Sequence, residues 1–437
     1  MKPDNTIYTA EIEGLTHEAQ GVARIDNKTV FIDGALPGER VSFRYTRRKR
    51  NFDEAEMLEV LAASTDRVSP RCDYFGLCGG CSFQHLNSQR QIEYKERQLL
   101  DSFKHVGGLK IPEVIPPLES SAHWGYRTKA RLGAKWVKKK NRVLVGFREK
   151  RKPFIADMSH CEVLPPEVAI LLPAFSSLIA DLSSPDQIPQ IEVAATKDIN
   201  AYVIRHMFDL TAEDTAKLLA FAKEHAIAIY SQRSGPDSIS LLYPESVILK
   251  YEIAPYGVSF EFQPTDFTQV NQTINARMVS LALELLQLNA NDKVLELFSG
   301  LGNFSLPIAN QVEHITAFEG DKGLVERATQ NAARNGITNI DFHSADLFDE
   351  TDLIKKQLPN AYNKLFLDPP RSGAVQILPK VVHRDLERIV YVSCNPATLA
   401  RDAKILVEEL GFKLQKAGVM DMFPQTSHVE SIALFTR

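Results

Sequence analysis

The chain has 437 residues, of which 44% are hydrophobic and 24% are charged, and its formal net charge is −4 at pH 7. This composition is ordinary for a soluble globular protein, and the length suffices for two or three domains that each bury a core. The longest apolar stretch, residues 168–180, contains Pro173 and is too short to cross a bilayer, and the N-terminus lacks the hydrophobic segment of a signal peptide. These features exclude a membrane-spanning or secreted protein, and we expect a cytoplasmic protein with reduced cysteines.

Residues 1–66 form the first predicted segment, in which apolar and polar positions alternate in short runs. Turn signals at residues 26–27, 33–34 and 37–38 separate these runs. The pattern predicts a small all-β barrel. Residues 21–41 resemble the TRAM domain, an OB-like module that binds RNA, so we expect an RNA-binding domain at the N-terminus.

Residues 67–262 form a second, β-rich segment whose pattern is less regular. Between residues 127 and 152 there are twelve Lys or Arg and a single acid, Glu149, and a shorter basic run covers residues 44–50. Each run alone fits a solvated surface as well as a binding surface. Two such runs, interleaved with aromatic residues in a chain of negative net charge, favour RNA as a partner.

Four of the five cysteines lie in this central segment, namely Cys72, Cys78, Cys81 and Cys161. Three of them occur within ten residues, which is an unusual spacing for unrelated cysteines. Four thiolates suit either Zn²⁺ or an iron–sulfur cluster, and the spacing alone leaves both open. The sequence therefore predicts a metal centre in the central segment.

Residues 263–437 form the third segment, and their pattern is the most regular. Apolar residues recur at helical spacing near residues 270–285, which predicts an amphipathic helix. Short apolar runs then alternate with helices, at residues 294–298, 315–318, 365–367 and 389–392. This alternation predicts an α/β, Rossmann-like domain with a mostly parallel sheet, on which part of residues 89–107 is expected to pack.

A ligand site is expected at the carboxyl edge of this sheet. The first strand leads into a loop with Gly300 and Gly302, and Glu319, Asp346 and Asp368 lie at or after the ends of the next three strands. The loop alone would fit a tight turn, and a single acid would fit a helix cap. Because parallel strands bring their carboxyl ends together, the combination predicts a nucleotide-type site, for S-adenosylmethionine rather than NAD.

Cys394 follows the apolar run that ends at residue 392 and is the one cysteine outside the cluster. A lone cysteine is more often a buried structural residue, but its position at the predicted ligand edge favours a nucleophile. C5 of uracil reacts poorly with a methyl sulfonium, and addition of a thiolate at C6 converts the ring to an enolate whose C5 accepts the methyl group. A base must then remove the C5 proton, and Glu430 is the predicted base.

Five motifs together resemble the RNA uracil-5-methyltransferase family, and the resemblance extends over essentially the whole chain. They lie at residues 266–271, 298–303, 368–371, 393–396 and 428–430. The resemblance implies S-adenosylmethionine as the cofactor, Cys394 as the nucleophile and Glu430 as the base. It also implies that six residues contact the cofactor: Gln269, Phe298, Asn303, Glu319, Asp346 and Asp368. Ser299 departs from the family pattern, since many members have Cys there, but it is not a matched catalytic position.

The cysteines and the TRAM-like segment together are similar to one ribosomal-RNA branch of this family. In that branch a four-iron, four-sulfur (4Fe-4S) cluster is held by this Cys pattern, which residues like Gln84, His85 and Lys95 follow. The resemblance thus implies that Cys72, Cys78, Cys81 and Cys161 bind such a cluster. It further implies 23S ribosomal RNA as the partner, with uracil 1939 as the expected target, and no obligate protein partner.

Other functions fit parts of the sequence. Methylation of a different ribosomal or transfer RNA uridine, or of cytosine at C5, would use the same thiol chemistry. A radical methylthiotransferase also combines an iron–sulfur cluster with a TRAM domain, but it requires a Cys-x3-Cys-x2-Cys loop and usually carries TRAM at its C-terminus. A non-catalytic RNA-binding protein would explain the basic runs but not Cys394 and Glu430 beside a cofactor edge.

Overall fold

The computed structural model describes residues 6–349, 358–359 and 361–437. The chain divides into two compact units. The first extends to residue 95 and adds residues 147–156 and 424–428, and the second contains residues 96–146, 157–423 and 429–437. None of the helices in the described residues is long and apolar enough to span a membrane.

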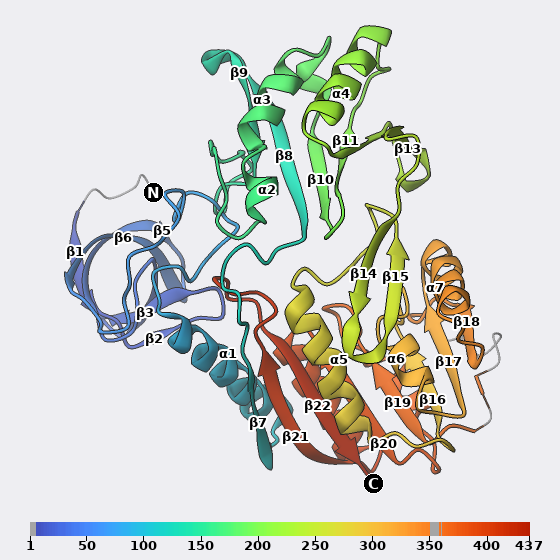
Figure 1. The fold of residues 1–437 in the computed structure, drawn as a ribbon. Helices are drawn as coiled ribbons and strands as arrows, with labels where there is room; N and C mark the ends of the chain where they lie inside the picture. The colour runs from blue at the N-terminus through green and yellow to red at the C-terminus, as the bar shows by residue number, and fades with distance from the viewer. Residues whose placement is uncertain (1–5, 350–357, 360) are drawn as a thin grey trace. The chain divides into compact units, whose positions relative to one another are not determined.

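The first unit is built on a curled six-stranded sheet, drawn in blue in Figure 1. Its strands follow the order β1-β5-β6-β4-β3-β2, and all pairs are antiparallel except β4 with β6. Apolar side chains on the inner face form its core, among them Val30, Ile32, Val41 and Phe43. The all-β N-terminal domain expected from alternating residues is thereby confirmed. The strands are β1 (Tyr8–Glu11), β2 (Gly14–Leu15), β3 (Gln20–Ile25), β4 (Lys28–Asp33), β5 (Arg40–Arg48) and β6 (Phe52–Ala62).

The second unit contains two large sheets, and the first of them lies in the central part of the sequence. It has six strands in the order β13-β12-β11-β10-β8-β9, with only β11 and β12 parallel. Helix α3 (Leu172–Ala180) packs on β9, and α4 (Ala212–Glu224) packs on β12 and β13. The strands are β8 (Lys129–Val137), β9 (Arg142–Gly146), β10 (Gln190–Ala195), β11 (Asn200–Arg205), β12 (Ala228–Gln232) and β13 (Ile239–Tyr243). A hairpin of β14 (Leu249–Ile253) and β15 (Val258–Phe262) follows.

The other sheet of this unit has eight strands in the order β18-β17-β16-β19-β20-β22-β21-β7. The first five are parallel, as the alternating pattern predicted, and β22 runs antiparallel to β20. The strands are β16 (Lys293–Leu297), β17 (His314–Glu319), β18 (Ile340–Ser344), β19 (Lys364–Leu367), β20 (Arg388–Ser393), β21 (Lys413–Met420) and β22 (Glu430–Thr436). The edge strand, β7 (Glu113–Leu118), comes from the segment 67–262 and pairs with β21.

Helices cover this sheet and connect its strands. The apolar periodicity near residues 270–285 corresponds to α5 (Gln272–Leu286), whose buried residues form one face. Helix α7 (Lys322–Arg334) follows β17, and α10 (Pro396–Glu408) follows β20. Shorter helices among the described residues include α2 (Pro166–Ala169), α6 (Ser305–Ala309) and α9 (Leu378–Val381), while α1 (Ser88–Ser102) precedes β7 in the chain.

A buried ion pair fixes the amino ends of the two central strands. The ammonium group of Lys364, the first residue of β19, lies 2.5 Å from the carboxylate of Asp292, which precedes β16, and both side chains are almost fully buried. Asp292 also accepts hydrogen bonds from the Asn363 side chain (2.7 Å) and the Asn289 backbone (2.7 Å). Burial alone would raise the pKa of Asp292, but the hydrogen bonds from Lys364 and its neighbours outweigh burial and lower it.

Replacing Asp292 with Asn should therefore destabilise the second unit. We expect the free energy of unfolding at pH 7 to fall by about 3 kcal/mol, because an unpaired ammonium group would remain buried. Urea titration measures this. The difference in the free energy of unfolding should have its full value above the pKa of Asp292 in the unfolded chain, about 3.8. It should vanish as the pH falls through the lower pKa of Asp292 in the folded protein, because protonated Asp292 no longer pairs with Lys364.

The matched control is Glu313→Gln, which removes an exposed partner of Lys293 at 3.1 Å. Exposed pairs contribute at most about 1 kcal/mol, so this variant should unfold almost like the wild type. Equal destabilisation by the two variants would contradict the role assigned to Asp292.

Candidate active site

The positions of the site residues follow from the register of the parallel strands. Leu297 of β16 lies opposite Leu367 of β19, which in turn lies opposite Tyr391 of β20. Phe298 and Asp368 are the next residues along β16 and β19. They therefore leave the carboxyl edge of the sheet at neighbouring positions, as the sequence predicted.

Cys394 and Glu430 are brought to the same edge by the antiparallel pair β20 and β22. Ser393 lies opposite Ser431, and the Ser431 hydroxyl donates a hydrogen bond of 2.9 Å to the Ser393 carbonyl. Cys394 follows Ser393, and Glu430 precedes Ser431, so the predicted nucleophile and the predicted base lie on the same side of this pair of strands. Cys394 is half-buried and Glu430 is buried.

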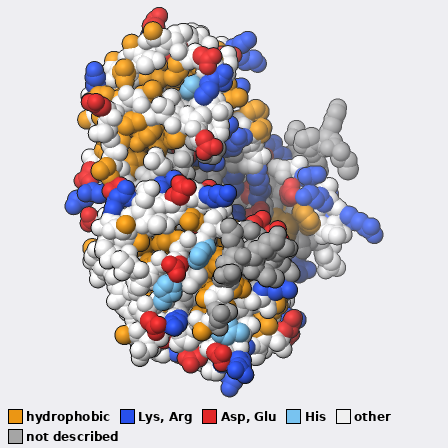
Figure 2. All heavy atoms as spheres, turned by 90° about the vertical axis from the view of Figure 1, so that its right-hand side faces the viewer, with side chains coloured by type: hydrophobic (Ala, Val, Ile, Leu, Met, Phe, Trp, Pro, Cys, Tyr) orange, Lys and Arg blue, Asp and Glu red, His pale blue; other side chains and the backbone are white. Residues whose placement is uncertain are grey.

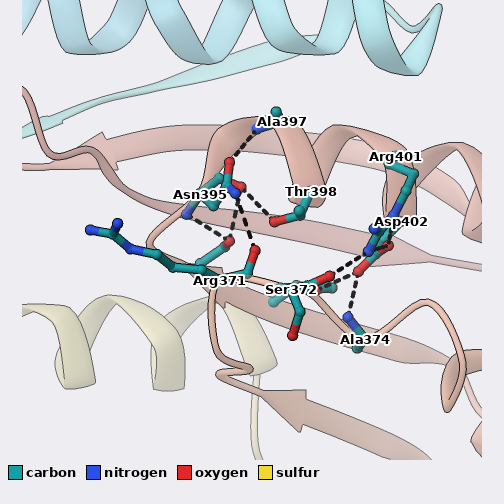
Figure 3. Close-up of polar contacts among 10 residues, drawn as sticks. Arg371, Ser372, Ala374, Asn395, Ala397, Thr398, Arg401 and Asp402 are labelled. Carbon is teal, nitrogen blue, oxygen red and sulfur yellow. Dashed lines mark hydrogen bonds and ion pairs between the residues drawn. The ribbon is translucent and has the colours of Figure 1, made fainter. Parts of the chain in front are cut away.

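The loop that carries Cys394 is tied to the loop that follows Asp368 (Figure 3). The Asn395 amide nitrogen donates to the backbone carbonyl of Arg371 at 3.1 Å. The Asn395 side-chain oxygen accepts from the Ala397 backbone at 3.1 Å and so caps α10, whose first residue is Pro396. One asparagine therefore starts the helix and holds both loops together.

A second connection runs through Asp402, which is fully buried in α10. One carboxylate oxygen accepts from the Ala374 backbone and the Tyr391 hydroxyl, both at 2.7 Å. The other accepts from the guanidinium of Arg401 at 2.7 and 2.8 Å, and Arg401 also donates to the Ser372 carbonyl at 2.8 Å. The loop at residues 371–374 is therefore held at several points by α10 (Figure 3).

Gly373 is required at the centre of this loop. Its φ angle is +77°, which favours glycine. A Cβ atom there would lie 2.6 Å from both the Arg401 guanidinium and the Asp402 carboxylate. A larger residue would have to displace the side chains that hold the loop.

The charges at this edge act strongly on one another. Burial, followed by the negative charges of Glu430 and Asp368, raises the pKa of the Cys394 thiol to about 11, and Arg371 partly opposes this shift. Burial raises the pKa of Asp368 to about 7. Burial and the neighbouring Asp368 raise the pKa of Glu430 well above its usual value, and Arg371 again opposes the shift. The site thus favours the protonated thiol, and both carboxyl groups ionise less readily than usual.

The loop after β16 offers open backbone beside an acid. Phe298, Gly300 and Gly302 have φ angles of +64°, +56° and +86°. A Cβ atom on Gly300 would meet nothing within 4 Å, so the backbone is open to a ligand at this point. Glu319, at the end of β17, accepts a hydrogen bond from the Gly300 N–H at 3.0 Å. The carboxylate and the loop predicted to form one site are therefore in contact.

The other predicted cofactor residues lie on the same unit with different surroundings. Asn303 exchanges two hydrogen bonds of 2.9 Å with Asn275 of α5 and accepts a third, of 3.1 Å, from the Tyr251 hydroxyl. Gln269 is half-buried just before α5. Asp346 is exposed after β18, where its carboxylate caps the Phe348 N–H at 2.9 Å. Asn303 thus anchors the glycine loop to α5.

Glu296 is a further buried acid that the sequence analysis did not single out. It lies inside β16, and one of its carboxylate oxygens has no hydrogen-bond partner. Burial raises its pKa to about 8, a hydrogen bond from Ser305 opposes this shift, and the charges of Asp368 and Glu319 add to it. The nearby loop also buries the hydroxyl of Ser299 without a partner. The sequence feature that could have pointed to Glu296 is the presence of one acid in an otherwise apolar strand.

The cysteines predicted to hold a metal are divided between the two units. Cys72, Cys78 and Cys81 belong to the first unit, and Cys161 belongs to the second. Burial raises the pKa of Cys78, the Gly80 N–H opposes this, and Cys72 adds to it. Within residues 6–349, 358–359 and 361–437, no three His, Cys, Asp or Glu side chains are grouped so as to hold a metal ion.

Comparison with known proteins identifies the family. The model of the tRNA (Uracil-5-)-methyltransferase family matches residues 89–437, and that of the TRAM domain matches residues 4–58. The 23S rRNA (uracil(1939)-C(5))-methyltransferase of Nitrosococcus oceani is 50% identical over 427 residues, which cover 98% of this chain and 95% of that protein. The protein of the same name from Hahella chejuensis is 49% identical over 98% of this chain and 97% of its own.

A solved structure supports the fold independently. The crystal structure of Pyrococcus abyssi tRNA (uracil-54, C5)-methyltransferase in complex with S-adenosyl-L-homocysteine matches with a TM-score of 0.76. The match covers 98% of this chain and 99% of that chain at 22% identity, so it shows a shared fold. The fold class and the resemblance derived from the motifs are both confirmed. The chain is an enzyme that belongs to the RNA uracil-5-methyltransferase family.

Proposed function

We propose that this enzyme transfers a methyl group from S-adenosylmethionine to C5 of a uridine in 23S ribosomal RNA, at position 1939. The observation that carries the proposal is the meeting of Cys394, Asp368, Glu430 and Arg371 at one sheet edge, where their charges shift one another's pKa values. A thiol beside two carboxyl groups is the set of groups that thiol-assisted methylation at C5 requires. The target position is supported by the names of relatives that match over nearly the whole chain.

The glycine loop fits S-adenosylmethionine, which supplies an electrophilic methyl group on a sulfonium. The open backbone at Gly300 permits close approach, and Glu319 can accept hydrogen bonds from ribose hydroxyls. Phe298 and Phe348 form a tilted pair of rings 5.9 Å apart beside this loop, a surface suited to an adenine ring. Gln269, Asn303, Asp346 and Asp368 are proposed as the remaining contacts.

In the proposed reaction, the Cys394 sulfur bonds to C6 of the uracil. With a pKa of about 11, the thiol is almost entirely protonated at neutral pH, so its proton must leave as the bond forms. The proton passes to Asp368, whose charge acts on the thiol, so that Glu430 stays ionised for the later step. The π electron pair of the C5–C6 double bond moves into the ring as an enolate. C5 then bonds to the methyl carbon as the bond between that carbon and the sulfonium sulfur breaks, and S-adenosylhomocysteine leaves.

Glu430 then completes the reaction. Its carboxylate removes the proton from C5, the C5–C6 double bond re-forms, and the Cys394 sulfur leaves C6. Burial that raises the pKa of Glu430 makes it a stronger base once it is ionised, and Arg371 favours that ionised form. The raised pKa of Glu430 and the nearby Arg371 thus allow Glu430 to take up the C5 proton once in each catalytic cycle.

The RNA would be held by parts of the chain outside the catalytic sheet. We assign this role to the TRAM-like barrel at residues 1–66 and to the central segment 67–262, with residues 263–437 performing the chemistry. A uridine in a folded RNA must leave its stack to reach Cys394, and the flanking nucleotides need contacts that compensate for the lost stacking. An enzyme acting on ribosomal RNA in this way would work in the cytoplasm.

We also propose that Cys72, Cys78, Cys81 and Cys161 hold a 4Fe-4S cluster, which would organise the RNA-binding part without a redox step. The donor chemistry fits, because four thiolates are the ligand set of such a cluster. His85, buried in the same unit with both ring nitrogens lacking partners, supports a further buried group nearby.

Replacing Cys394 with Ala should reduce methyl transfer to a 23S RNA fragment by about 10³-fold or more, since no nucleophile remains to activate C5. Affinity for S-adenosylmethionine, measured by calorimetry on the same variant, should not change. The methylated position is mapped with labelled cofactor on the wild type. Wild-type turnover by the variant would contradict the mechanism, and transfer to another position would contradict the target.

Replacing Glu430 with Gln should trap the methylated RNA on the enzyme, because the C5 proton can no longer be removed. We expect a covalent complex that survives denaturation in SDS and carries the labelled methyl group. Glu313→Gln makes the same chemical change at an exposed position and should leave no complex. Product release at the wild-type rate by the Glu430 variant would exclude it as the base.

Anaerobically purified protein should contain about four iron and four sulfide per chain. Cys78→Ser should lower the iron content and bleach the visible absorbance of the cluster. Cys394→Ala, the matched cysteine change outside the cluster, should retain both. One zinc per chain, or metal content unaffected by the Cys78 change, would rule out the 4Fe-4S assignment.

A further inference from the structure

The second unit has a cleft of about 780 Å³ that none of the proposed roles uses. One wall comes from the central sheet, with Gln190, Arg205 and Gln232, and the opposite wall comes from the loop after β15 and the start of α7. Most of the residues that line it are charged or carry amide or hydroxyl groups, so an apolar partner surface does not suit it. A ligand here would be recognised by hydrogen bonds.

Three neighbouring strands present a row of amide and guanidinium groups to this cleft. Gln190 of β10 lies opposite Arg205 of β11, and Arg205 lies opposite Gln232 of β12. Residues opposite one another in a sheet project from the same face, so the three side chains form a continuous row. Side-chain amides and guanidinium groups are the groups that proteins use to read the edges of nucleobases.

Arg205 is the member of this row whose hydrogen-bonding capacity is unused. Its Nε atom is buried and has no partner, and no carboxylate in the described part of the chain forms an ion pair with it. The other arginines of the cleft form ion pairs, Arg131 with Glu192 at 3.0 Å and Arg327 with Asp266 at 2.6 Å, although the Nε atom of Arg327 is also buried without a partner. A buried donor without an acceptor is costly, so a ligand that supplies one would be bound favourably.

The charge of the cleft argues against a general polyanion site. Glu192, Asp237, Asp266 and Asp321 line it together with the three arginines. On the face shown in Figure 2, basic and acidic side chains are likewise interspersed rather than segregated. A single nucleotide with a specific set of acceptors fits this mixture better than a run of phosphates does.

The cleft also lies beside the predicted cofactor residues along the chain. Asp321 and Leu324 line it, and the Asp321 N–H donates to the Glu319 carboxylate at 3.0 Å. On the other side, Asp266 and Phe267 line it a few residues before Gln269, and the Phe267 side chain is 71% exposed. An occupant would therefore lie next to the residues assigned to methyl transfer.

We propose that this cleft binds one unstacked nucleotide of the substrate RNA that flanks the target uridine, through Arg205 and the Gln190 and Gln232 amides. The inference rests on the proposed function, because it takes the RNA as the occupant. It adds a specificity site in the central sheet, separate from the residues that perform the chemistry. The flanking base would supply the acceptor that Arg205 lacks.

The test combines a protein variant with changes in the RNA. Arg205→Met should raise KM for a 23S RNA fragment about tenfold while leaving KM for S-adenosylmethionine unchanged. Fragments with an abasic residue at each flanking position should reveal one position where the wild type also loses about tenfold. Arg205→Met should lose nothing further at that position, because the same contact is already absent.

Arg233→Met is the matched control, since Arg233 adjoins Gln232, pairs with the exposed Asp209 at 3.0 Å and does not line the cleft. It should behave as the wild type. Equal KM values for the two arginine variants, or a wild type indifferent to every abasic position, would overturn the proposal, and the second result does not depend on how well a variant folds. RNA binding is measured separately by anisotropy, so Arg205-dependent binding without methylation would count against the proposed function alone.

Discussion

The hydrogen bonds to the Asp402 carboxylate hold together the loops at the carboxyl edge of the sheet, where the candidate active site lies. This carboxylate is fully buried and joins three parts of the chain, because its partners are the Ala374 backbone, the Tyr391 hydroxyl and the Arg401 guanidinium. Strand register alone brings Asp368 and Cys394 to one edge, but it does not fix the loops that follow them. Asp402 does so from the first turns of α10, together with Asn395. A buried carboxylate is costly without such donors, so the loop and the helix each require the other.

That rigidity allows the site to keep groups that repel one another. Asp368 and Glu430 each resist ionisation, and both raise the pKa of the Cys394 thiol, so the resting site does not favour the reactive thiolate. Arg371 is the cation that opposes the shifts of Cys394 and Glu430, and its backbone carbonyl is held by Asn395. The reactivity of the thiol therefore depends on the position of a loop as well as on the thiol itself. An unreactive resting thiol also resists alkylation and oxidation before RNA binds.

The sequence predicted the features that follow from the order of strands along the chain. It did not predict the features that depend on contacts between residues far apart in the sequence. The alternation of apolar runs and helices located β16, β17, β19 and β20, and therefore the edge where Cys394 lies. Nothing local indicated that β7 would pair with β21, just over three hundred residues later, because an edge strand has no distinctive periodicity. Glu296 was missed since one acid in an apolar run does not disclose that it faces the interior. The row at Arg205 was invisible for the same reason: its members are far apart in sequence and meet only through register.

The unpaired Arg205 and the crowded carboxyl groups have a common physical consequence. Both cost free energy in the protein alone, one as a donor without an acceptor and the other as acids whose ionised forms repel. A nucleotide in the cleft would supply an acceptor for Arg205. A uracil bonded to Cys394 would supply a proton that a carboxylate at the sheet edge can accept. Binding energy gained at Arg205 can then offset the cost of unstacking the target base, which makes no productive contact until it reaches the thiol. The central sheet would then contribute to specificity for the RNA, because the cost of unstacking the target uridine would be offset only when the correct flanking nucleotide is bound in the cleft.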